Sequence, residues 1–398
     1  MPKTIIFFAD GTWNGPGSAP YDPDGHRPQV DGPAPELTNV CKLFGWLKGD
    51  LTSIWGAAEM EKALNDSNGT PVQIAKYIHG VGDSQNVLDR FAGGAFGIGV
   101  VARIARGYTY ISRNYVPGDS ILIVGFSRGS YTARALAGLI VAEGVLKPAL
   151  ATDVADKYDN AVAAWYRYRH GSDSTLIQRI LDGLDEFKEI WKCFKRPDLT
   201  DEDFVRIDEL AAVVVWDTVG SLGIPIYSND GAQRDIFEFC DTKLSPKVRL
   251  GLHAVSLDEK RESFTPTLWE GAPNVTQALF PGGHCDVGGG YVEHELSDVP
   301  FLWFVDRLQH PDVGLEFNTD SPTATMPDAC GCAHAEWNKF PWSELGVSPR
   351  IMRSGLIVHD AVRQRMNGGL VQSEPPPMEP SKYCPTNLLN ISSGTPIG

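Results

Sequence analysis

The chain has 398 residues, of which 42% are hydrophobic, and it carries a formal net charge of −15. This length and composition allow either one large α/β domain with insertions or two to three smaller domains. The acidic balance argues against a nucleic-acid partner, which would require basic faces, and against simple electrostatic docking on an anionic membrane. A neutral or lipid-like ligand is compatible with it.

The chain shows no targeting or membrane-spanning segment. No apolar run approaches the roughly 20 residues of a transmembrane helix, and the N-terminus lacks the apolar region and cleavage site of a signal peptide. Seven cysteines, an odd number in a large chain, indicate free thiols and a reducing compartment. We expect a cytoplasmic protein. Transient membrane contact, export by a route without a signal peptide, and the oligomeric state are left open.

Apolar runs and helical spacing alternate along the chain. They predict strands at 4–9, 72–79, 121–124, 211–216, 248–257 and 277–280, and helices at 37–47, 98–115, 131–140 and 302–308. Strands that alternate with helices predict an α/β fold, with a mostly parallel central sheet and helices on both faces, as a single domain over 1–398.

Two segments depart from this alternation. Residues 151–205 are polar and helical, and we interpret them as an inserted lid or cap, with a peripheral helical pair as the alternative. The segment 369–398 carries three consecutive prolines and predicts an extended C-terminal tail.

A Gly-x-Ser-x-Gly pattern ends the third predicted strand. Gly125-Phe126-Ser127-Arg128-Gly129 follows four aliphatic residues and precedes a helical pattern. Glycines at both ends of the pattern allow strand and helix to approach closely, with Ser127 at the tip of a strained turn. This arrangement is typical of the nucleophile elbow of α/β-hydrolases; a glycine-lined turn with an N-cap serine is the alternative.

A serine nucleophile needs a base, and the base needs an acid that orients it. Asp217 and Asp258 both follow predicted strands, and the glycines after Asp217 favour it. His284 lies in a loop between Gly282-Gly283 and Gly288-Gly289-Gly290, just after a strand. The predicted catalytic residues are therefore Ser127, His284 and Asp217, with Asp258 as the other candidate acid.

The developing oxyanion also needs hydrogen-bond donors. One is expected from the amide of Arg128, and the second from Gly11 or Thr12 in the loop after the first strand. Asp10 in that loop and Asp286 beside His284 are candidate supporting residues, and a plain turn role is the alternative for Asp286. The series Cys330-x-Cys332-x-His334 is spaced too tightly for the usual zinc pairs.

Several of these segments together resemble a known family. FADGTWN, YVPGDSILIVGFSRGSYTARALAGLI, VWDTVGSLG, LHAVSLDEKRESFTPTLW and FPGGHCDVGGGY occur in this order. The set resembles the uncharacterised α/β-hydrolase family that includes phospholipase effectors of type VI secretion systems. The resemblance covers roughly residues 4–310. It implies a hydrolase of carboxyl esters with Ser127 as nucleophile, Asp217 as acid and His284 as base.

The resulting hypothesis is a serine hydrolase that cleaves small-molecule or lipid esters, including phospholipid-like ones, through an acyl-enzyme. The chemistry requires no metal and no organic cofactor. Two alternatives are an acyltransferase that uses the same triad and a non-catalytic, toxin-associated binding module with a structural elbow.

Overall fold

The computed structural model describes most of the chain. The described residues are 2–11, 37–57, 59–80, 95–152, 158–170, 198–219, 242–318, 325–340, 342–344, 346–374, 379–385 and 387–388. Of the predicted features, Thr12 and a large part of the 151–205 segment lie outside them.

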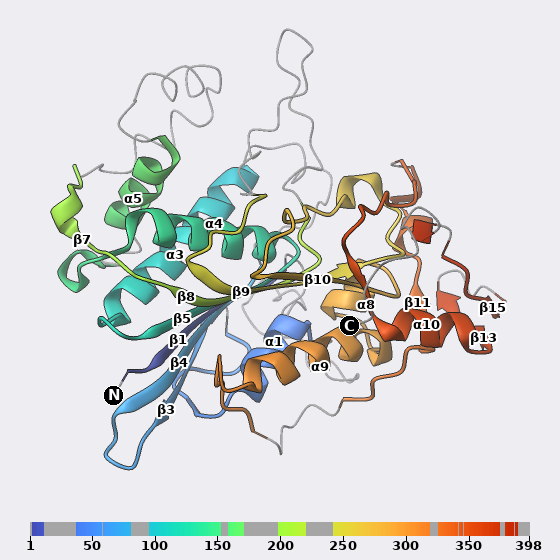
Figure 1. The fold of residues 1–398 in the computed structure, drawn as a ribbon, viewed down its shortest axis with the longest axis horizontal. Coiled ribbons are helices and arrows are strands. Elements are labelled where there is room, and N and C mark those ends of the chain that lie inside the picture. The colour runs from blue at the N-terminus through green and yellow to red at the C-terminus, as the bar shows by residue number, and fades with distance from the viewer. Residues whose placement is uncertain are drawn as a thin grey trace, which may run out of the picture.

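A nine-stranded sheet forms the centre of the molecule (Figure 1). Its order is β2 (Asp50–Leu51), β3 (Glu59–Asn65), β4 (Pro71–Ile78), β1 (Thr4–Ala9), β5 (Ser120–Phe126), β8 (Leu210–Trp216), β9 (Val248–Ser256), β10 (Val275–Phe280) and β12 (Ile357–Val358). From β4 to β12 every neighbouring pair is parallel, and only the β2–β3–β4 end is antiparallel. The predicted α/β fold with a mostly parallel sheet is confirmed.

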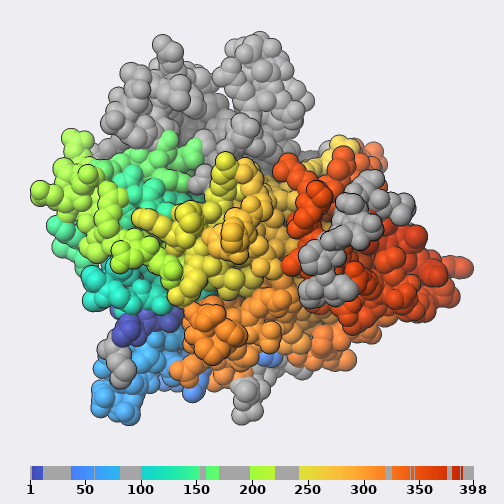
Figure 2. Space-filling model, viewed as in Figure 1, coloured from blue at the N-terminus to red at the C-terminus, as the bar shows by residue number. Residues whose placement is uncertain are grey.

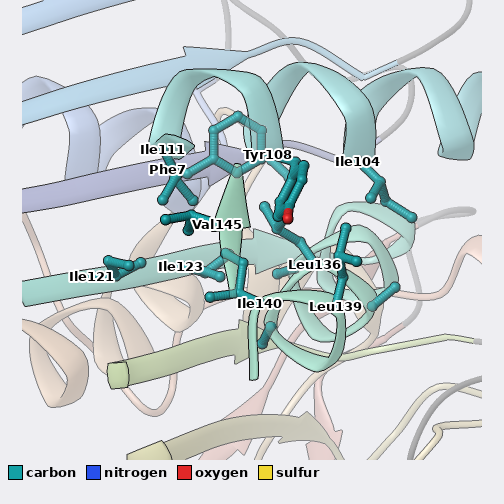
Figure 3. Close-up of a cluster of buried hydrophobic side chains, with 14 of the residues drawn as sticks. Phe7, Ile104, Tyr108, Ile111, Ile121, Ile123, Leu136, Leu139, Ile140 and Val145 are labelled. Carbon is teal, nitrogen blue, oxygen red and sulfur yellow. The ribbon is translucent and has the colours of Figure 1, made fainter. Parts of the chain in front are cut away.

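Alternate residues of the central strands divide between two hydrophobic cores, because successive side chains of a strand point to opposite faces. One core joins Phe7, Ile121 and Ile123 to side chains of the helices α3 (Ala95–Asn114), α4 (Arg128–Glu143) and α5 (Asp159–His170). Figure 3 shows Tyr108 of α3 and Leu136 of α4 packed over these strand residues.

The second core lies on the other face of the sheet. It joins Phe8, Val124 and Trp216 to α1 (Asn39–Trp46) and α9 (Glu295–Gln309). Both faces are covered, so the central strands read as continuous apolar runs in the sequence. This burial on two sides explains why β1, β5 and β8 could be located from composition alone.

The predicted helices exist but differ in extent. The helix expected at 302–308 begins at Glu295 and contains Pro300 within it. Its first turn is held by tertiary contacts, since Lys42 pairs with Asp298 at 2.8 Å and the Asn39 amide donates to the carbonyl of Ser297 at 2.8 Å. A proline that would disfavour a helix locally is therefore accommodated.

The C-terminal residues fold back onto the sheet. Strand β12 extends it beyond β10, and α10 (Asp360–Asn367) follows directly. The remaining short pairs are β6 (Val145–Leu146) with β7 (Phe204–Val205), β11 (Ala333–His334) with β14 (Ser373–Glu374), and β13 (Leu370–Val371) with β15 (Ser381–Lys382). The predicted tail thus contains β14, β13 and β15, whereas the predicted lid contributes α5 and β7 to the described residues.

The elbow between β5 and α4 depends on glycines that touch backbone. A Cβ on Gly125 would lie 2.4 Å from the carbonyl oxygen of Gly129, and a Cβ on Gly129 would lie 2.0 Å from that of Ala9. Neither neighbour is a flexible side chain that could move aside. The glycines predicted to allow close approach therefore do so, by letting α4 pack against the ends of β5 and β1.

We predict that Gly129→Ala lowers the free energy of unfolding by more than about 4 kcal/mol or prevents folding, because the added methyl group collides with backbone. Gly271→Ala is the matched control, since Gly271 is exposed and a Cβ there meets nothing within 4 Å. Urea unfolding of both variants measures the difference. Equal midpoints for the two would contradict a close contact between Gly129 and the backbone of Ala9.

Candidate active site

Ser127 lies between the end of β5 and the start of α4 in a strained conformation. Its φ of 57° and ψ of −123° are unusual for a residue with a side chain. Its amide donates to the carbonyl of Trp216 at 3.0 Å, and its carbonyl accepts from the amide of Ser130 at 3.1 Å. Strand, strain and helix together form the elbow that the Gly-x-Ser-x-Gly pattern predicts.

His284 and Asp217 meet at the same edge of the sheet. Asp217 follows β8, and His284 begins the short helix α8 (His284–Gly288) after β10. The Nδ1 atom of His284 lies 2.5 Å from Oδ2 of Asp217, and both side chains are buried. Of the two candidate acids, Asp217 is therefore the one bonded to the His284 ring.

Asp217 is held by donors from several segments. Its Oδ1 atom accepts from the Ser256 amide at 2.9 Å and from Arg350 at 2.7 Å, and Oδ2 accepts from Arg350 at 2.9 Å as well as from His284. Like Ser127 it has a positive φ, 35°. Burial alone would raise the pKa of Asp217, but the Arg350 guanidinium and the His284 ring hold it well below its usual range.

The surroundings of the His284 ring favour its neutral form, which can accept a proton. Burial lowers its pKa below the ordinary 6.5, and the nearby Asp217 carboxylate opposes that shift only in part. Ionised Asp217 can only accept a hydrogen bond, so Nδ1 of His284 must be the donor. The neutral ring therefore carries its proton on Nδ1, and Nε2 has an available lone pair. This is the tautomer that can take a proton from a serine hydroxyl.

The His284 ring contacts two aromatic side chains, one of which belongs to the elbow. The ring of Phe126, the residue directly before Ser127, lies 4.7 Å from the His284 ring, centroid to centroid. Phe264 makes a T-shaped contact with the imidazole, with ring centroids 5.0 Å apart. These contacts limit rotation of the ring, which is buried.

An ion pair next to His284 was not predicted from the sequence. Glu259 accepts from the backbone amide of His284 at 3.1 Å and from Nε and Nη2 of Arg261 at 2.8 Å each. Burial would raise the pKa of Glu259, but Arg261 lowers it to about 2. The only sequence signal was the position of Glu259 beside Asp258, the residue that the prediction considered.

The residue that follows Asp10 after β1, Gly11, lies close to the elbow. A Cβ built on Gly11 would lie 3.5 Å from the Cβ of Ser127. The Gly11 amide, however, donates to Oδ1 of Asp10 at 2.6 Å, so in this structure it is occupied. Arg128, the other predicted oxyanion donor, is the first residue of α4, and burial together with nearby Arg103 lowers the pKa of its side chain to about 9.

The remaining predicted residues brace loops. Asp258 accepts from the Gly282 amide at 2.6 Å and from the Tyr383 hydroxyl at 2.9 Å. Asp286 accepts from the Gly283 amide at 2.7 Å and pairs with Nδ1 of His334 at 2.6 Å. Both carboxylates thus hold the glycines before His284.

The described residues contain neither a cluster of metal ligands nor a helix that could span a membrane. Within them no group of three or more histidine, cysteine or acidic side chains is arranged to hold a metal ion. None of the helices that the structure describes combines the length and apolarity needed to cross a bilayer. Cys41, Cys285, Cys330, Cys332 and Cys384 are free thiols, and the cytoplasmic location inferred from cysteine usage stays a prediction.

A mostly parallel sheet, a strained serine between strand and helix, and a buried histidine–aspartate pair at the same edge define an α/β-hydrolase. The family described as "T6SS, Phospholipase effector Tle1-like, catalytic domain" matches residues 3–307. The chain belongs to this family, which confirms the resemblance seen in the sequence.

Individual relatives are distant and longer. An uncharacterised protein of Saccharomyces cerevisiae, YEL023C, is 27% identical over 299 residues, which cover 75% of this chain and 36% of the yeast protein. An uncharacterised Pseudomonas aeruginosa structure has a TM-score of 0.41 and 16% identity, over 80% of this chain and 46% of its own. A Tle1 effector bound to the VgrG spike of the type VI secretion system has a TM-score of 0.38 and 19% identity, over 73% and 51%.

The buried carboxyl of Asp10 should make the free energy of unfolding depend on pH. Burial raises its pKa to about 6, although the Tyr77, Thr38 and Gly11 donors oppose this. The pKa of an aspartate in the unfolded chain is about 3.9. The protonated carboxyl of Asp10 therefore stabilises the fold below about pH 4, and this stabilisation is lost as the pH rises through 6. Relative to Asp10→Asn, we expect wild-type unfolding free energy to fall by about 2–3 kcal/mol from pH 4 to 7.

Urea unfolding across this pH range measures the difference between the two proteins. Asp208→Asn, at an exposed carboxylate, is the control, and we expect it to change stability by less than about 0.5 kcal/mol at any pH. A constant gap between wild type and Asp10→Asn would contradict the raised pKa.

Proposed function

We propose that this protein is a serine hydrolase of lipid carboxyl esters, with Ser127 as nucleophile, His284 as general base and Asp217 as the orienting acid. The observation that carries the proposal is the buried His284–Asp217 pair at the same edge of the sheet as a strained serine. Membership of a phospholipase family supports lipid esters, phospholipids among them, as the substrate class.

The reaction follows from the positions of these groups. Ser127 Oγ attacks the acyl carbonyl while Nε2 of His284 accepts its proton. The imidazolium that forms is stabilised by Asp217, which stays ionised because Arg350 also pairs with it. His284 then protonates the leaving alcohol, and water releases the acyl group from Ser127 by the same steps in reverse.

The tetrahedral intermediate needs donors for its oxyanion. We assign one to the Arg128 amide, at the start of α4, where the helix dipole also favours negative charge. The second is assigned to the loop that begins at Gly11. Since the Gly11 amide donates to Asp10 here, the Gly11 assignment requires that bond to be exchanged for one to the substrate.

The first test is ester hydrolysis by wild type and Ser127→Ala on p-nitrophenyl esters of increasing chain length and on phospholipid vesicles. We expect kcat/KM to fall roughly 10⁴-fold or more in the variant, and a fluorophosphonate to label the wild type but not the variant. Ser130→Ala is the control, because the Ser130 hydroxyl donates to the carbonyl of Trp216 and is buried in the elbow.

The outcomes of this test separate the alternatives. Turnover that persists in Ser127→Ala, or wild-type protein that neither turns over an ester nor reacts with the fluorophosphonate, would contradict the proposal. Transfer of the acyl group to added alcohols in preference to water would identify an acyltransferase that uses the same residues.

The lowered pKa of His284 gives a second prediction. Since the neutral ring is the active form and burial disfavours its protonation, kcat/KM should rise with pH along a limb whose midpoint lies below about 6.5. Initial rates from pH 4 to 8 on a substrate that does not itself ionise measure this limb. A midpoint above pH 7 would show that burial does not dominate at His284.

A further inference from the structure

Arg350 lies beyond residue 307, where the family match ends, yet it contacts the proposed catalytic acid. Its Nη1 atom is 2.7 Å from Oδ1 of Asp217, and its Nη2 atom is 2.9 Å from Oδ2. The two side chains are 3% and 0% exposed. Two parallel bonds from one guanidinium fix the plane of the carboxylate as well as its position.

The same guanidinium is tied to the backbone of two other segments. Nη1 also donates to the carbonyl of Ser256 at 2.7 Å, at the end of β9, and Nη2 donates to the carbonyl of Phe264. Phe264 is the residue whose ring packs on His284. Arg350 therefore joins the acid, the neighbouring strand and the wall of the histidine in one network.

The surrounding chain places Arg350 there. The amide of Ser348 donates to the carbonyl of Lys260 at 2.8 Å, and the amide of Glu262 donates to the carbonyl of Gly346 at 3.2 Å. In Figure 2 the red C-terminal residues adjoin the yellow residues that precede His284 in the chain. The segment that carries Arg350 is thus packed directly beside the site.

We propose that Arg350 is a positioning residue that holds the Asp217 carboxylate against His284, so that a segment outside the family match completes the active site. This inference rests on the proposed function, in which Asp217 orients the base. Lysine at this position could supply a charge but could not make two parallel bonds and reach both carbonyls.

Arg350 also affects how the site depends on pH. The ionisable groups that face the pair are Arg350 and His253 around Asp217, and Glu259 and Arg261 around His284. Burial lowers the pKa of His253 to about 3, so it stays neutral where the enzyme would work. The charge that balances Asp217 directly is therefore that of Arg350.

Removal of Arg350 changes both partners in the same direction. An Asp217 carboxylate without its cation favours the protonated imidazole, which raises the pKa of His284. Buried Asp217 also becomes easier to protonate. In either case activity is lost at a higher pH than in the wild type, so the acidic limb of kcat/KM moves upward.

The experiment compares Arg350→Ala and Arg350→Lys with a matched control. Arg365→Ala is that control, because Arg365 is a buried arginine of the same segment that donates to the carbonyls of Ala329 and Gly331, at 2.9 and 2.7 Å. Its loss should lower the melting temperature without moving the pH profile. Arg350→Ala should lower kcat roughly 100-fold and move the acidic limb upward by about one pH unit.

Two further measurements distinguish a positioning role of Arg350 from a role in folding stability alone. Millimolar guanidinium chloride should restore part of the activity of Arg350→Ala but none in Ser127→Ala. Arg350→Lys should keep the acidic limb near that of the wild type while kcat falls and KM stays. If Arg350→Ala does not fold, as its melting curve would show, Arg350→Lys decides alone, and a wild-type kcat in that variant would overturn the proposal.

A titration that needs no substrate distinguishes failure of this inference from failure of the proposed function. The His284 ring is followed by NMR in ¹⁵N-histidine-labelled protein, with its signal assigned by its loss in His284→Gln. We expect it to titrate at a higher pH in Arg350→Ala than in wild type. An unchanged titration and an unchanged pH profile would overturn the role of Arg350, whereas inactive wild type would count against the proposed hydrolase alone.

Discussion

The buried carboxylate of Asp217 is the interaction on which the rest of the site depends. A carboxylate with no exposed surface is strongly destabilising unless it is paired and hydrogen-bonded. Here the Ser256 amide, the Arg350 guanidinium and the His284 ring supply the donors. Each comes from a different part of the chain, so the acid is stable only when the strands β8, β9 and β10 and the C-terminal segment have assembled around it.

The parallel sheet makes that assembly simple. Strands β5, β8, β9 and β10 run side by side in the same direction, so their carboxyl ends open at one edge. Ser127 follows β5, Asp217 follows β8 and His284 follows β10. Positive φ angles at Ser127 and Asp217 mark the two places where the backbone turns sharply to present a side chain at this edge. Among the described residues, the two non-glycine residues with a positive φ both belong to the proposed site.

Prediction from the sequence succeeded where local signals and burial agreed. The residues of β1 and the Gly-x-Ser-x-Gly turn were placed correctly because buried parallel strands are continuous apolar runs and the turn requires glycine. The hairpin β2–β3 was not predicted, because the β3 sequence Glu-Met-Glu-Lys-Ala-Leu-Asn consists largely of helix-forming residues. As an outer strand it is stabilised instead by its pairing with β4 and by ion pairs from Lys76 to Glu59 and Glu61.

By itself the sequence determined the fold class, the family, the elbow at Ser127 and the glycines on both sides of His284, since each is encoded by neighbouring residues. The residues between those glycines form the short helix α8, whereas the sequence predicted a loop. The sequence favoured Asp217 as the acid and kept Asp258 as the other candidate, because both follow strands. Only the tertiary structure showed the Asp217 carboxylate in contact with the imidazole, and only folding brought Arg350 to that carboxylate across 133 positions of sequence. Contacts between distant side chains depend on how strands and loops are packed in space, and no local pattern in this chain records that packing.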